Sequence, residues 1–203
     1  YKRQPPGFAF EHDDVCECNP TAGGGWGDPI LREAERVAAD VRERAISPEV
    51  AQRIFCVALD KDGNVDAAAT EQARKAERKM RLGWPADKTL PAPLKADAKA
   101  ETIALVGDVA RVAKIGGRAY FVCNCGCAIA PASENWKSYA RSMPASPIDL
   151  GPRVRLHEDL EVARYACPHC ATLLDVEVKR PTEAPLFDVE LDSAPRGAAR
   201  SAA

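Results

Sequence analysis

Apolar residues recur at helical spacing in the first third of the chain. The stripe consists of Ile30, Ala34, Val37, Val41 and Ala45. Asp28 and Pro29 precede it, and these residue types are typical of an N-cap and a first helical position. Ser47, Pro48 and Glu49 repeat the same start signal. The pattern predicts an amphipathic helix beginning after Asp28 and a short second helix after Ser47.

The pattern changes after the second helix. Residues 54–59 are rich in β-branched and aromatic side chains, which predicts a buried strand. Residues 60–64 have turn composition, and Asp66 is positioned to cap a third helix over residues 67–82. Gly83 suits the C-terminal cap of that helix.

The second half of the chain has the pattern of strands. Residues 109–113 and 118–122 flank Gly116 and Gly117, which predicts a β-hairpin. Ser133 is expected to cap a short helix that extends through Tyr139. Two further strands are expected at the positions 161–166 and 172–178.

These elements predict an α+β protein with a small helical N-terminal module and a C-terminal β-rich module like a zinc ribbon. Prolines between the modules indicate a semi-extended linker. The end of the chain, rich in Ala, Pro and Ser, indicates a tail disordered from about Asp192. The expected divisions are an extended arm with a Gly-rich loop at 1–28, a helical module at 29–83, a linker at 84–101, a zinc-binding β module at 102–181 and a tail at 182–203.

Cysteines cluster at the ends of two predicted strands. One cluster holds Cys123 and Cys125, and the other holds Cys167 and Cys170. Zinc prefers soft ligands at tetrahedral positions, and two short turns that each donate a pair of thiolates meet that requirement. The second pair has the usual two-residue spacing, and the first pair is one residue tighter. The sequence predicts one structural zinc ion held by these four residues.

Other ligand sets remain open at this stage. Cys127 can take the place of Cys123, and His169 can replace one thiolate. Buried free thiols would leave unexplained why both clusters end a strand and enter a turn. A redox dithiol is disfavoured because Cys167 and Cys170 do not begin a helix, and a catalytic zinc is disfavoured because four thiolates leave no position for water.

Three further features have candidate chemistry. Asp60, Asp62, Asn64 and Glu71 follow a calcium-loop count, but Val65 replaces the required glycine, so a turn is expected. Cys16 and Cys18 lack a second pair and are expected near solvent or against a partner subunit, whereas Cys56 is expected in the core. The glycine run 23–27 matches no nucleotide-binding spacing and is expected to pack against another chain. Trp136 is expected to cover the zinc cluster.

Composition excludes several functions. The net charge is −2, from 28 basic and 30 acidic residues spread along the chain, so a nucleic-acid partner is not expected. A zinc ribbon that contacts nucleic acid is a weaker alternative. No apolar run is long enough for a membrane span, and the clustered cysteines favour a reducing, cytoplasmic location. The missing initial methionine suggests a processed or trimmed product.

Two resemblances follow from these motifs. Residues 109–180, with the motifs Cys-Asn-Cys-Gly at 123–126, Glu-Asn-Trp-Lys at 134–137 and Cys-Pro-His-Cys at 167–170, resemble the gamma subunit of acetone carboxylase. Residues 20–80, with Gly-Gly-Gly-Trp-Gly-Asp-Pro at 23–29, resemble the C-terminal end of the hydantoinase B family, which includes large subunits of ketone carboxylases and hydantoin-cleaving enzymes.

The resemblances imply a zinc-containing accessory subunit of a multisubunit, ATP-dependent, biotin-independent ketone carboxylase. Its partners would be the large subunits, which would hold ATP, a divalent metal and the catalytic residues. Cys127 stands where the gamma family would have a histidine, and the large body of the hydantoinase B family is absent. A component of a hydantoinase or oxoprolinase type of amidohydrolase is the alternative.

Overall fold

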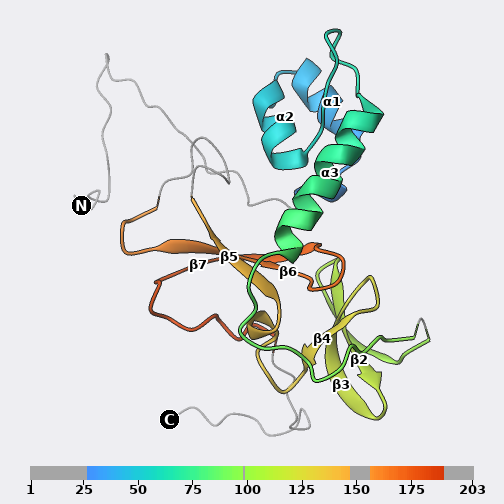
Figure 1. Ribbon diagram of the computed structural model, residues 1–203, viewed down its shortest axis with the longest axis vertical. Coiled ribbons are helices and arrows are strands. Elements are labelled where there is room, and N and C mark those ends of the chain that lie inside the picture. Colours follow the sequence, from blue (N-terminus) through green and yellow to red (C-terminus); the bar gives the residue numbers. More distant parts are fainter. Residues whose placement is uncertain (1–26, 98, 147–155, 190–203) are drawn as a thin grey trace, which may run out of the picture.

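The computed structural model describes residues 27–97, 99–146 and 156–189, which form a mixture of helices and antiparallel sheets (Figure 1). This confirms the predicted mixture of helix and sheet. The predicted arm, including Cys16, Cys18 and most of the glycine run, lies outside the described residues, apart from Gly27 and Asp28. In the part that is described, no helix is both long and apolar enough to cross a membrane.

Three predicted helix caps are confirmed. Asp28 accepts a hydrogen bond from the backbone N–H of Ile30, and Ser47 and Asp66 cap their helices in the same way. Each cap satisfies a backbone donor that the first helical turn leaves unpaired. The helical elements are η1 (Pro29–Leu31), α1 (Ala34–Arg42), α2 (Pro48–Phe55) and α3 (Ala67–Leu82). Figure 1 shows α1 and α2 at one end of the molecule, with α3 leading toward the sheets.

The first predicted helix is wrong as a continuous element. Arg32 and Glu33 have extended backbone angles, which separate the 3-10 turn η1 from α1. The two pieces have different neighbours. Asp28, the cap of η1, accepts a hydrogen bond from the N–H of Leu173 in the C-terminal half of the chain, whereas Val37 of α1 packs against α2 and the loop that follows α2. Tertiary contacts therefore override the continuous apolar stripe, which does not distinguish one helix from two.

The predicted strand at 54–59 is also wrong. Ile54 and Phe55 form the last turn of α2, and Cys56 has a φ of 51°, which ends the helix. Only Leu59 pairs like a strand residue, in an isolated bridge to Val65. The run is apolar because its side chains complete the helical core, in which Val57 is buried. A short apolar run does not separate a buried strand from a helix end.

The first sheet has the strand order β1-β2-β3-β4, with all neighbours antiparallel. The predicted hairpin is confirmed: Ile115 pairs with Arg118, and Gly116 and Gly117 between them have φ values of 56° and 81°. Such positive angles favour glycine. The strands are β1 (Thr102–Val106), β2 (Ala110–Ile115), β3 (Arg118–Cys123) and β4 (Ala128–Pro131), of which β1 and β4 were not predicted.

The second sheet has the strand order β5-β6-β7, again antiparallel. Its strands are β5 (Arg141–Ala145), β6 (Glu161–Ala166) and β7 (Leu173–Lys179). The predicted strands at 161–166 and 172–178 are confirmed as β6 and β7, while β5 was not predicted. The helix expected after Ser133 is only the 3-10 turn η2 (Trp136–Ser138), and its cap is Asn135, which accepts from the N–H of Lys137.

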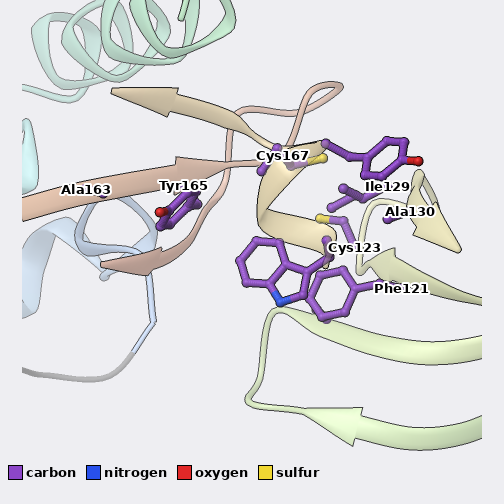
Figure 2. Packing of buried hydrophobic residues seen from close by; sticks show 11 residues of the cluster. Phe121, Cys123, Ile129, Ala130, Ala163, Tyr165 and Cys167 are labelled. Carbon is purple, nitrogen blue, oxygen red and sulfur yellow. The ribbon is translucent and has the colours of Figure 1, made fainter. Parts of the chain in front are cut away.

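One apolar core joins the two sheets. Trp136 lies at its centre: its ring stacks on Phe121 of β3 at 4.6 Å and meets Tyr165 of β6 edge-on at 6.0 Å. Cys123 and Cys167 belong to the same buried cluster (Figure 2). Trp136 thus shares a buried cluster with Cys123 and Cys167, and its role as a cover for a zinc ion stays a prediction.

A buried lysine ties the core to the C-terminal segment. The Lys137 Nζ atom lies 2.8 Å from Asp175, 3.1 Å from Glu177 and 3.0 Å from Asp188, and its side chain is 2% exposed. Asp188 also accepts a hydrogen bond from the indole N–H of Trp136. Lys137 therefore neutralises carboxylates from β7 and from the segment that follows β7.

Residues 84–97 lie outside helices and strands but are bonded to both sheets. The N–H of Ser142 in β5 donates to Pro85 O, and the N–H of Ala128 in β4 donates to Leu94 O. Trp84, which is 2% exposed, lies under the guanidinium group of Arg164 in β6 at 4.8 Å. We call this stretch the seam segment, because it joins the two sheets along one side.

Candidate metal centre

The first cysteine turn follows directly from β3. Cys123 is the last residue of that strand, and its N–H donates to Cys127 O at 2.9 Å. Gly126 has a φ of 87° and donates its N–H to Cys123 O, which closes the turn. Glycine suits this position because it adopts a positive φ without steric cost.

The second cysteine turn follows directly from β6. The N–H of Cys167 donates to Thr172 O, and the N–H of Ala171 donates to Cys167 O. Ala171 has a φ of 62°, in the left-handed region that usually favours glycine. The backbone N–H of His169 lies 3.5 Å from Cys167 Sγ, so the turn directs a backbone donor at the sulfur.

The two turns bring four sulfur atoms together. Cys123 Sγ lies 3.7 Å from Cys170 Sγ, and Cys125 Sγ lies 3.8 Å from Cys167 Sγ. All four ligand atoms lie within 4.8 Å of one another, and this group could hold a metal ion. Cys123 and Cys167 are buried, whereas Cys125 reaches the surface. The cluster therefore joins one sheet to the other at the edge of the shared core.

The two competing donors lie beside this group of four but outside it. Cys127 directs its thiol at the carbonyl oxygen of Ala128, at 3.5 Å. His169 is exposed, and its Nδ1 atom lies 3.9 Å from Cys125 Sγ. Among the described residues, the compact set is the one predicted from sequence: Cys123, Cys125, Cys167 and Cys170.

The protein without metal keeps protons on part of this cluster. Hydrogen bonds with Cys167 and Cys170, together with burial, raise the pKa of the Cys123 thiol. Burial raises the pKa of the Cys125 thiol to about 12. Cys167 has a lowered pKa because neighbouring thiols donate hydrogen bonds to its sulfur. A cation is the group that would allow all the sulfurs to become thiolates at neutral pH.

Metal affinity is expected to fall as the pH falls. Cys123 and Cys125 have raised pKa values, so both thiols are protonated at neutral pH and must lose their protons when a metal binds. Releasing at least two protons makes the apparent affinity drop roughly 100-fold or more for each pH unit between about pH 8 and 6. Competition with a chromophoric zinc chelator at several pH values measures this slope. An affinity independent of pH would contradict the thiol assignment.

The other residues singled out from the sequence have structural partners. Asp60 accepts hydrogen bonds from the N–H groups of Asp62 and Asn64, so its carboxylate closes a turn, as expected in place of a calcium loop. Cys56 is buried, as predicted. Sequence reasoning missed Thr172, whose hydroxyl lies 3.2 Å from Cys170 Sγ. Its position directly after the second cysteine turn was the available signal.

Comparison with known proteins finds a family model that matches the part of the chain with both cysteine turns. Residues 102–195 match the family model of the acetone carboxylase gamma subunit. The matched segment contains the four clustered cysteines and both sheets, and the match agrees with the predicted resemblance of residues 109–180.

A second comparison relates the chain to a subunit of another enzyme. The beta subunit of caprolactamase from Pseudomonas jessenii is 42% identical over 62 residues. That stretch is 30% of this chain and 10% of the relative, so the chain spans about a tenth of the relative's length. The resemblance of residues 20–80 to the hydantoinase B family stays a prediction.

Proposed function

We propose that this chain is a zinc-containing accessory subunit of an ATP-dependent ketone carboxylase of the acetone carboxylase type. In this proposal Cys123, Cys125, Cys167 and Cys170 hold one structural zinc ion, and the catalytic residues belong to larger partner subunits. The gamma-subunit family match across both cysteine turns is the observation that carries the proposal.

The chemistry of the donor set supports a structural role for the metal. Four sulfur donors suit zinc and leave no open coordination position, whereas catalytic zinc sites keep one for water. Two of the donors are buried in the core shared by the sheets. The ion would therefore act as a cross-link between β3 and β6, and the bound zinc would supply no reaction step.

The match to a named subunit of an enzyme supports a role within a complex. Both the family and the caprolactamase relative are described as subunits. In this proposal ATP and a divalent metal are bound by the larger partner subunits. A cytoplasmic location is part of the same proposal.

Purification of the full chain from its native host tests the proposal. We expect large subunits of the ATP-dependent carboxylase type to copurify and to be identified by mass spectrometry. Metal analysis of the recombinant chain is expected to find one zinc per chain. Cobalt(II) substitution should give the charge-transfer absorption of thiolate ligands in tetrahedral geometry.

Isolation from the host as a lone monomer would refute the assignment to a complex. Absence of stoichiometric zinc in the reduced recombinant protein would refute the metal assignment. Because the two measurements are independent, the role in a complex and the metal site can fail separately.

The caprolactamase relative favours a second candidate function. In this alternative the chain belongs to a complex that opens lactams or related cyclic amides, in agreement with the predicted hydantoinase or oxoprolinase alternative. Assays of the purified native complex separate the two. ATP-dependent incorporation of labelled bicarbonate into a ketone supports the carboxylase, and ring opening of a lactam without bicarbonate supports the alternative.

A further inference from the structure

A buried carboxylate connects the helices to the second cysteine turn. The Asp28 side chain is 0% exposed, and its Oδ2 atom accepts hydrogen bonds from Arg81 Nη1 at 2.7 Å and from the N–H of Leu173 at 2.8 Å. Asp28 precedes η1, Arg81 belongs to α3, and Leu173 begins β7. One side chain thus joins three elements that are far apart in the sequence.

Arg81 makes a second contact with the same turn. Its Nη1 atom also donates to the carbonyl oxygen of Ala171 at 3.2 Å, and its Nε atom donates to Glu77. Ala171 follows Cys170 directly and has a left-handed backbone conformation. The position of this carbonyl oxygen therefore depends on the path of the cysteine turn.

The residue before Asp28 lies near a turn that is bonded to the first cysteine turn. A Cβ atom on Gly27 would lie 3.2 Å from Asp108 Oδ2, so the backbone of Gly27 passes close to the turn between β1 and β2. Asn124, between Cys123 and Cys125, donates its side-chain amide to Asp108 O and its N–H to Val109 O. Gly27 therefore lies close to a turn bonded to the first cysteine turn, and Asp28 is bonded to the residue that follows the second.

We infer that metal binding at the two cysteine turns fixes the position of the helices, through a clamp formed by Gly27, Asp28 and Arg81. The inference rests on the metal binding proposed above and adds a conformational role to it. Metal draws the two turns together, which sets the Ala171 carbonyl and the Leu173 N–H in the positions that Asp28 and Arg81 require. Without metal, only the sulfur contacts and the shared core hold the two turns together, so the acceptor and the donor of the clamp are held less firmly.

Thermodynamic linkage makes this coupling reciprocal. If metal stabilises the clamp, the clamp must increase metal affinity by the same factor. A substitution in the clamp should therefore weaken zinc binding although it removes no zinc ligand. A purely local metal site would show no such dependence.

Hydrogen–deuterium exchange of the full chain tests the inference. Zinc-loaded and chelator-treated protein are compared, with α1 as an internal reference because its Val37 is buried in the helical core. We expect zinc removal to increase exchange in the second cysteine turn, at residues 28–31 and at the C-terminal end of α3, but not in α1. An increase confined to the cysteine turns, or one that includes α1, would overturn the inference.

Asp28→Asn supplies the reciprocal test. We expect its zinc affinity, measured by chelator competition, to fall about 5-fold or more, and exchange at the end of α3 to be high with or without zinc. Lys75→Gln is the matched control, because it removes a charge from the exposed Glu71–Lys75 pair on the same α3 helix. Equal zinc affinities of Asp28→Asn and the control would overturn the inference.

The experiments distinguish failure of the inference from failure of the proposed function. If the protein binds no zinc, the metal part of the proposed function fails. If zinc binds with the expected stoichiometry but the ends of α3 and η1 do not respond to its removal, the clamp alone is refuted. The chelation measurement uses the unchanged chain, so it remains decisive if Asp28→Asn does not fold.

Discussion

Replacing Cys167 by serine is expected to abolish stoichiometric zinc binding and to lower the free energy of unfolding by roughly 4 kcal/mol or more. Cys167 is fully buried, lies 3.8 Å from Cys125 Sγ and belongs to the core that joins the sheets. The substitution removes a ligand and places a hydroxyl in an apolar cluster. Metal analysis and urea unfolding of the purified variant measure the two effects.

Cys127→Ser is the matched control for this prediction. Cys127 is a cysteine in the same region, but it lies outside the compact group of four and directs its thiol at a backbone carbonyl. We expect this variant to retain one zinc per chain and nearly full stability. If Cys127→Ser lost the metal while Cys167→Ser kept it, the ligand set would have to be reassigned.

Replacing Lys137 by methionine is expected to lower the free energy of unfolding by about 3–5 kcal/mol, because breaking a buried ion pair leaves an uncompensated charge. Methionine retains the apolar length of lysine but leaves Asp175, Glu177 and Asp188 without their shared cation. Urea unfolding at neutral pH measures the loss. A cost below about 1 kcal/mol would show that these carboxylates find other partners.

The control for Lys137 is Lys88→Met. Lys88 pairs with Glu134 at 2.8 Å, but both side chains are about half exposed, so the expected cost is much smaller than that of Lys137→Met. Burial acts to lower the pKa of Lys137, but its hydrogen bonds with Asp175 and Asp188 outweigh burial and raise it. A raised lysine pKa gives stability that is fully present below the ordinary value of 10.5 and is lost above it. The cost of Lys137→Met should therefore be constant through the neutral pH range.

Local signals predicted helix starts and hairpin geometry well. Asp28, Ser47 and Asp66 were assigned as caps from the sequence, and each accepts the expected backbone hydrogen bond. A helix cap and a hairpin turn depend mainly on a few neighbouring residues, so a local sequence pattern is enough to predict them. The break at Arg32 and Glu33 depends instead on the distant partners of Asp28, which no local pattern reveals.

The strands that were missed, β1, β4 and β5, all lie at the edges of their sheets. The strand β5 contains Pro144, and prolines normally argue against a strand, but β5 lies at the edge of its sheet, where a missing N–H is tolerated. The strand β1 is also an edge strand, and Leu105 on it is 79% exposed. Both form because the neighbouring strand supplies hydrogen bonds, an effect of tertiary structure.

The cysteine cluster was predictable because its chemistry restricts the alternatives. Two pairs of cysteines at strand ends suit one soft metal ion, and the fold brings Cys123, Cys125, Cys167 and Cys170 together. The sequence did not reveal the clamp at Asp28, because Arg81 and Leu173 are 53 and 145 residues away from it. Contacts between residues so far apart in the sequence are seen only in the three-dimensional structure.

The seam segment has a consequence for how the protein can be shortened. A truncated chain that begins at residue 102, the start of the family match, would omit residues 84–97. The N–H of Ala128 in β4 would then lose its acceptor, the carbonyl oxygen of Leu94. The N–H of Ser142 in β5 would lose the carbonyl oxygen of Pro85. The contact of the Trp84 ring with Arg164 and the apolar contacts of Leu90 and Leu94 would be removed as well. The smallest stable unit with both sheets should therefore begin before Trp84, well upstream of the region that defines the family.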